Sequence, residues 1–140
     1  MANKAIKDFQ IFVKPAGAAC NLACSYCYYR DRPASTPEPS GGFMTIPILK
    51  AYIRQQIEAT QSNTIRFSWH GGEPTLMGLD FFKQIVEIQK RYLSAGQQIL
   101  NGIQTNGILL NEKWCSFFAK EGFQVGLSLD GPAEIHDRHR

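Results

Sequence analysis

The chain has 140 residues, about the size of one ordinary domain, and its 44% hydrophobic and 19% charged residues are typical of a soluble globular protein. A net charge of +3 gives no reason to expect a nucleic-acid or membrane partner. The chain begins without an apolar run of signal-peptide length, and no segment approaches a membrane span. We therefore expect a cytoplasmic protein.

Strand-like and helix-like segments alternate along the chain. The pattern of apolar residues predicts four strands, at 9–13, 65–69, 99–104 and 125–129. It also predicts three helices, one with Ile46, Leu49, Ile53 and Ile57 at helical spacing, one from about Asp80 to Leu93 with Phe82, Ile85, Val86 and Tyr92 on one face, and one with Trp114, Phe117 and Phe118.

Punctuating residues mark the ends of these elements. Thr45 and Asn111 are suitable helix N-caps, and Gly122 is a suitable helix C-terminus. A stretch rich in proline and glycine, 31–44, predicts a flexible surface loop. The last residues, 134–140, begin a further element, and we expect its basic end to be solvated rather than to form a nucleic-acid patch.

Strands joined by single helices predict an α/β fold with a parallel sheet and right-handed crossovers. Ligands of such sheets gather beyond the carboxyl ends of the strands, an edge that we call the rim. Four distinctive segments are expected there: the cysteine loop (residues 14–30), the turn at 71–74, the segment 104–107, and Ser128. Their convergence predicts a binding site at the rim.

Three of the four cysteines, Cys20, Cys24 and Cys27, lie in the cysteine loop at the spacing C-x-x-x-C-x-x-C. They are too close together in the sequence for disulfides among them to stabilise a fold. Because the chain also has no export signal, they favour metal or redox chemistry over disulfides. Four thiolates normally close a [4Fe–4S] cluster, and three would leave one iron open to bind a small molecule. Cys115 stands apart on an aromatic helix, where we expect a small buried hydrophobe.

Zinc is the alternative metal, because three cysteines and one histidine form known zinc sites. His70, His136 or His139 could supply the fourth ligand. Zinc sites usually draw pairs of ligands from two separate turns, and the chain has no second C-x-x-C pair. The spacing therefore favours the iron–sulfur interpretation.

The cysteine loop with Tyr26 before its third cysteine, followed by Gly71-Gly72-Glu73-Pro74, resembles the radical S-adenosylmethionine (SAM) superfamily. Further phrases are similar to the anaerobic sulfatase-maturating enzymes, namely Lys14-Pro15, 69–75, 103–107 and 126–132. The resemblance extends from about Phe9 to Arg140. It implies the N-terminal part of a partial (β/α)6 barrel that binds a [4Fe–4S] cluster and SAM.

The resemblance also implies roles for individual residues. The three clustered cysteines match the cluster ligands, Tyr26 matches an aromatic residue near the adenine of SAM, and Gly72 matches a glycine that contacts the SAM amino group. Ser128 and Arg140 match positions that hold the SAM carboxylate or ribose. The cofactor-binding set is then Tyr26, Gly71, Gly72, Glu73, Ser128 and Arg140, with Tyr29 and His70 as possible substrate-cavity residues.

The implied reaction is reductive cleavage of SAM, followed by oxidation of a peptidyl cysteine or serine of a sulfatase to formylglycine. An external electron donor such as flavodoxin or ferredoxin is implied. In the family, a general base and the auxiliary clusters belong to a C-terminal part that is not in this sequence. We therefore expect 1–140 to be a truncated radical SAM core with little turnover alone. Alternatives are a radical SAM maturase of a ribosomal peptide and a non-catalytic iron–sulfur or zinc module.

Overall fold

The computed structural model describes residues 9–29 and 42–140, in which four strands form one parallel sheet in the order β1-β2-β3-β4. The elements in chain order are β1 (Phe12–Val13), α1 (Ile46–Ala59), β2 (Thr64–Trp69), the short 3-10 helix η2 (Pro74–Met77), α2 (Leu79–Tyr92), β3 (Gln98–Thr105), α3 (Glu112–Glu121), β4 (Gln124–Leu127) and α4 (Ala133–His139). The predicted α/β class and parallel topology are confirmed.

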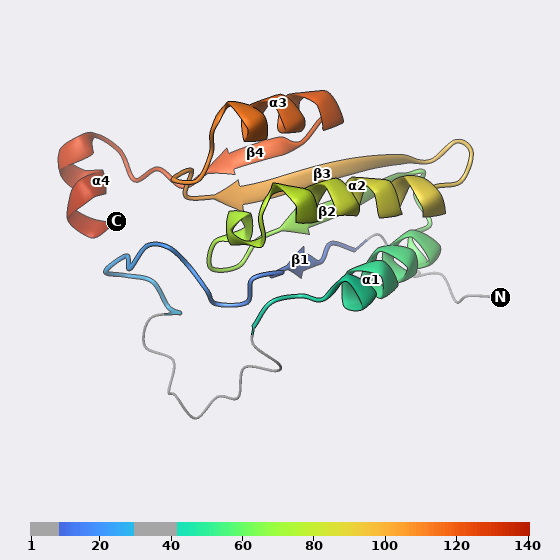
Figure 1. The fold of residues 1–140 in the computed structure, drawn as a ribbon, viewed down its shortest axis with the longest axis horizontal. Helices are drawn as coiled ribbons and strands as arrows, with labels where there is room; N and C mark the ends of the chain where they lie inside the picture. The colour runs from blue at the N-terminus through green and yellow to red at the C-terminus, as the bar shows by residue number, and fades with distance from the viewer. Residues whose placement is uncertain (1–8, 30–41) are drawn as a thin grey trace.

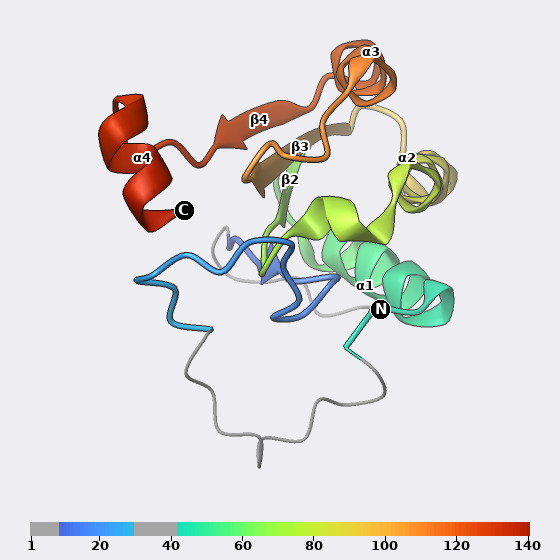
Figure 2. The ribbon, with the colours of Figure 1, turned by 60° about the vertical axis from the view of Figure 1, so that its left-hand side comes forward.

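Helices α1, α2 and α3 cover one face of the sheet, and Figure 2 shows them side by side along it. Most side chains of the sheet that face these helices are large and apolar, and they share this face because alternate residues of a strand point to the same side. Ile65, Phe67 and Trp69 of β2 are almost completely buried there, as are Phe82 and Ile85 of α2. This layer is the hydrophobic core.

All four strands end on the same side of the molecule, at the left of Figure 1, where the cysteine loop and α4 also lie. The register brings Val13 of β1 beside Trp69 of β2, so the cysteine loop leaves β1 directly beside the turn that follows β2. Ile103 pairs with Trp69 and Val125 in the same way. The predicted rim is therefore a feature of the observed fold.

Local signals explain the helix ends. The side chain of Asn111 accepts hydrogen bonds from the backbone N–H groups of Lys113 and Trp114, and Gly122 ends α3 in the left-handed conformation with φ 68°. Thr45 is the N-cap of α1 as predicted, although its side chain makes no capping hydrogen bond. Glu73 caps η2, an element that the sequence pattern did not predict.

Two strands are shorter than predicted. Residues 9–11 precede β1 without backbone pairing, and the ladder with β2 holds only Phe12 and Val13. The last strand ends at Leu127 because its partner β3 ends at Thr105, after which the Ser128 N–H still donates to the Thr105 carbonyl at 2.9 Å.

Of the four apolar residues at helical spacing in α1, Leu49, Ile53 and Ile57 are buried and Ile46 is 38% exposed. One burial prediction is wrong. Cys115 is exposed, since Trp114 and Phe118 are the residues of α3 that face the core and Cys115 lies next to that face.

The predicted proline- and glycine-rich loop falls mostly outside the described residues, which resume at Gly42. Across the described ranges, no helix combines the length and the apolar character that crossing a membrane requires.

Candidate cofactor site at the rim

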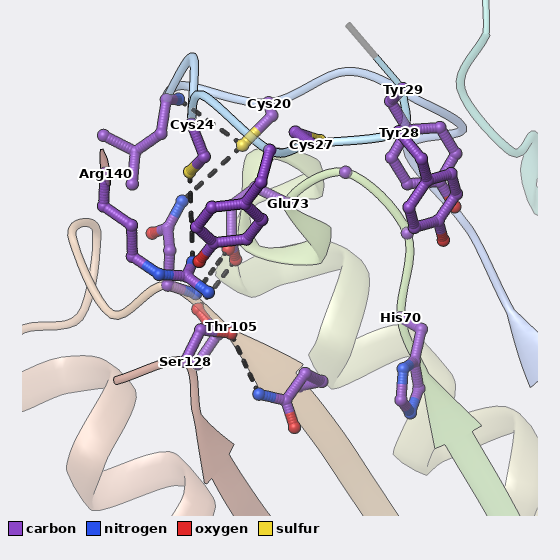
Figure 3. Close-up of a pocket in the computed structure, with 16 residues that line it drawn as sticks. Cys20, Cys24, Cys27, Tyr28, Tyr29, His70, Glu73, Thr105, Ser128 and Arg140 are labelled. Carbon is purple, nitrogen blue, oxygen red and sulfur yellow. Dashed lines mark hydrogen bonds between the residues drawn. The ribbon is translucent and has the colours of Figure 1, made fainter. Parts of the chain in front are cut away.

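A cavity of about 230 Å³ opens at the rim, between the cysteine loop, the turns after β2 and β3, and the segment after β4 (Figure 3). Every residue nominated for the cluster, for SAM or for the substrate cavity lines this cavity, whereas the zinc candidates His136 and His139 do not: the lining includes Cys20, Cys24, Tyr26, Cys27, Tyr29, His70, Gly71, Gly72, Glu73, Ser128 and Arg140. Gln104, Thr105 and Asn106, from the segment after β3, line it as well. Residues up to 120 positions apart in the chain thus meet at one place.

The three clustered cysteines differ in their surroundings. Cys24 is buried, Cys27 is half-buried and Cys20 is exposed, and all four cysteines of the chain are free thiols. The Cys20 sulfur accepts a hydrogen bond from the Leu22 N–H at 3.4 Å and lies 3.7 Å from the side-chain amide nitrogen of Asn106. N–H donors of this kind stabilise negative charge on sulfur.

The two glycines after β2 allow the turn to approach the cysteine loop closely. The Gly72 N–H donates to the Gly17 carbonyl at 2.9 Å, and the Glu73 N–H donates to the Ala19 carbonyl at 2.7 Å. A Cβ atom on Gly72 would lie only 2.1 Å from the Ala19 oxygen, so any side chain there would displace the loop. Gly71 has φ 126°, a conformation that side chains disfavour.

Glu73 is the most deeply buried carboxylate of the site, with 1% of the residue exposed. One of its oxygens accepts hydrogen bonds from the Thr75 N–H, the Thr75 hydroxyl and the Thr105 hydroxyl, at 3.0, 2.6 and 2.8 Å. The other accepts from the Asn106 N–H at 2.8 Å. A buried charge needs such partners, and these bonds join the turn after β2 to the end of β3.

Residues that follow β4 form a further part of the cavity lining. Ser128 accepts a hydrogen bond from the Gln104 amide at 2.9 Å. Arg140 reaches in from the end of α4 and donates through Nε to Asp130 at 2.8 Å. The pKa of Asp130 lies below its usual value because Arg140, and then Tyr26, donate hydrogen bonds to its carboxylate. The basic end of α4 is therefore partly a component of the site rather than wholly solvated.

A family model for the radical SAM superfamily matches residues 15–140. The chain belongs to the radical SAM superfamily. Membership implies SAM and a [4Fe–4S] cluster as the cofactors of the family, and the resemblance noted in the sequence is confirmed at this level.

Several curated relatives are anaerobic sulfatase-maturating enzymes. The serine-type enzyme of Bacteroides thetaiotaomicron is 42% identical over 134 residues, which cover 96% of this chain and 32% of that enzyme. The cysteine-type enzyme of Clostridium novyi is 38% identical over 135 residues, which cover 96% of this chain and 36% of that enzyme. The chain thus spans about a third of the length of these relatives.

The solved structure of native anSMEcpe with bound AdoMet and the Kp18Cys peptide has a similar fold. Its TM-score is 0.83 at 37% sequence identity, over 94% of this chain and 34% of that one. The fold of this chain therefore matches the part of the anSMEcpe structure that it covers.

The donor set of this radical SAM chain fits an iron–sulfur cluster, because thiolates are the usual ligands of such clusters and three free thiols line one cavity. Within 9–29 and 42–140, no three histidine, cysteine or acidic side chains gather closely enough to hold one metal ion. A cluster binds each thiolate through a different iron, so its ligands need not converge on one point. His139, one candidate zinc ligand, instead contacts Ser25 through Nδ1 at 3.0 Å.

The other side of the radical SAM cavity is aromatic (Figure 3). The ammonium group of Lys14 lies 4.9 Å from the ring centre of Tyr29 and 5.8 Å from that of Tyr28. The His70 ring packs edge-on against Phe12 at 4.7 Å. Burial, and next the positive charge of Lys14, lower the pKa of His70, which favours the neutral imidazole.

Sequence reasoning missed three residues of the site. Leu22 and Tyr28 line the cavity, and Asp130 holds Arg140. Leu22 and Tyr28 were within reach of the motif argument, because they lie inside or next to the cysteine triplet. Asp130 lies within the family-like phrase 126–132, but Asp130-Gly131-Pro132 is typical of an ordinary turn and gives no sign of a bond to Arg140.

Proposed function

We propose that this chain forms the cluster- and SAM-binding part of an anaerobic sulfatase-maturating enzyme. The observation that supports it best is the meeting of three free thiols, a double-glycine turn, a serine and an arginine around one cavity at the rim. Similarity to both serine-type and cysteine-type maturases supports a peptidyl serine or cysteine as the substrate, with formylglycine as the product.

In this proposal, Cys20, Cys24 and Cys27 hold the cluster as thiolates. When bound, the cluster would supply the electron that cleaves SAM. N–H groups around the Cys20 sulfur would stabilise the negative charge that reduction adds. The bond from Asn106 depends on Glu73, which fixes the Asn106 backbone.

The remaining residues would bind and orient SAM. Carbonyl groups of the Gly71-Gly72 turn are suitable acceptors for its ammonium group, and glycine allows a ligand to approach the backbone closely. The guanidinium of Arg140 is suited to its carboxylate, and the Ser128 hydroxyl to a polar group of the ribose.

The peptide would enter along the aromatic wall of Tyr28, Tyr29 and His70, opposite Arg140. Neutral His70 could accept or donate a hydrogen bond there without adding charge. An external electron donor would complete the set of partners.

Anaerobic reconstitution of the chain with iron and sulfide tests the proposal. We expect a brown protein with about four irons per chain and an EPR signal that changes when SAM is added. Cys24→Ala should abolish iron binding, whereas Cys115→Ala, the matched change outside the cavity, should leave it intact. A colourless protein that binds one zinc per chain would contradict the proposal.

A further inference from the structure

Helix α4 is held against the cysteine loop by residues more than one hundred positions apart in the chain. The Ser25 N–H donates to the His139 carbonyl at 2.8 Å, and the Ser25 hydroxyl lies 3.0 Å from His139 Nδ1. Ser25 directly follows Cys24, so α4 contacts the loop between two of the three clustered cysteines.

One carboxylate joins both sides of this contact. The Oδ2 atom of Asp130 accepts a hydrogen bond from the Tyr26 hydroxyl at 2.5 Å and another from Arg140 Nε at 2.8 Å. Tyr26 belongs to the cysteine loop, whereas Arg140 follows α4. Asp130 itself lies in the turn between β4 and α4, where its N–H donates to His136 Nδ1 at 3.4 Å.

These bonds determine where the guanidinium of Arg140 lies. Its central carbon is 5.5 Å from the ring centre of Tyr26, and its Nη1 atom is 4.0 Å from the Cys24 sulfur. Only 16% of the Arg140 side chain is exposed. Because Nε is used by Asp130, the terminal nitrogens remain to meet an anion in the cavity, and a planar guanidinium held in this way loses little freedom on binding.

We infer that Asp130 is a positioning residue that fixes Arg140 and Tyr26 together, so that the cavity presents a preoriented cation to the carboxylate of its ligand. The part that concerns SAM rests on the proposed function. The part that concerns α4 rests only on the contacts above. A carboxylate suits this position because both partners donate to it, whereas an amide would offer a weaker, uncharged acceptor.

Amide hydrogen exchange of the full chain without cofactors tests the first part. In Asp130→Asn we expect the Ser25 amide and the amides of 133–140 to exchange about tenfold faster or more, as loss of a charge-assisted bond implies. Asp137→Asn removes the same charge from an exposed position of α4 and should leave these rates unchanged. Equal rates in Asp130→Asn and the unmodified chain would overturn the inference.

SAM binding to the reconstituted chain tests the second part. Asp130→Asn should weaken SAM binding about tenfold while the iron content stays the same. Arg140→Met should weaken binding at least as much, and the double variant should lose less than the product of the two single losses, because part of the effect of Asp130 is exerted through Arg140. Asp130→Glu, which keeps the charged acceptor, should bind more tightly than Asp130→Asn.

The hydrogen-exchange and SAM-binding experiments distinguish a failure of this inference from a failure of the proposed function. Losses that multiply in the double variant, or SAM binding unchanged in Asp130→Asn, would show that Asp130 does not position Arg140. A chain that takes up no cluster and no SAM would contradict the proposed function, and the exchange rates would still decide whether Asp130 holds α4.

Discussion

The core under the helices and the rim beyond the strands are stabilised in different ways. In the core, the Phe82 ring packs edge-on against Trp69 and Trp114, with centroids 6.3 and 5.3 Å apart. At the rim, Glu73 and Asp130 collect hydrogen bonds from segments far apart in the chain. The core therefore depends on side-chain volume, whereas the rim depends on particular charged acceptors.

The largest effect is expected in the core. Phe82 is fully buried, so Phe82→Ala should lower the free energy of unfolding by about 3–5 kcal/mol, measured by urea denaturation. Phe43→Ala removes the same ring from a residue that is 47% exposed and should cost far less. Similar losses in the two variants would mean that the core does not depend on ring packing.

A change of one atom at the rim tests the second half of the comparison. Glu73→Gln keeps the side-chain size but replaces a charged acceptor with an amide, so we expect it to lower the free energy of unfolding by about 2 kcal/mol. It should also alter the chemical shift of the Asn106 amide. Glu58→Gln, which breaks only a surface pair with Arg54, should cost less than about 1 kcal/mol. Equal costs would mean that the rim depends on its buried carboxylate no more than the surface depends on an exposed ion pair.

The smallest effect concerns the charge next to His70. Lys14→Met should raise the pKa of His70 but leave it below its usual value, because burial is the larger cause of the lowered pKa. Since the unfolded chain binds this proton more readily, His70 stabilises the fold above its unfolded pKa and loses that contribution as the pH falls. Lys14→Met should therefore reduce the stability that the fold loses through His70 at low pH. NMR titration of the His70 ring measures the shift, with exposed Lys50→Met as the control.

Much of the fold was predictable because its signals are local. The side chain of Asn111 and the left-handed Gly122 fix the ends of α3 within a few residues, and alternating strands and helices fix a parallel sheet. The same topology brought the nominated residues to one rim. Strand ends were less predictable, since β4 stops where its partner β3 stops and not where its own pattern ends.

The connections within the site were not predictable, because they join residues that no local pattern relates. Nothing in the sequence around Asp130 indicates its bonds to Tyr26 and Arg140, 104 and 10 positions away. The burial of Cys115 was predicted from its residue type and from the aromatic helix that carries it, but the orientation of α3 leaves Cys115 exposed. Motifs therefore identified most members of the site, while the three-dimensional structure supplied the bonds among them.

The outer edge of β4 has a practical consequence for handling the chain. Within the described residues β4 pairs only with β3, and Val125 and Leu127 are 44% and 54% exposed. A bare strand edge with apolar neighbours is a template for pairing with another copy. Preparations of the chain should therefore self-associate as concentration rises, and Val125→Lys should reduce the light that they scatter without altering the uptake of iron.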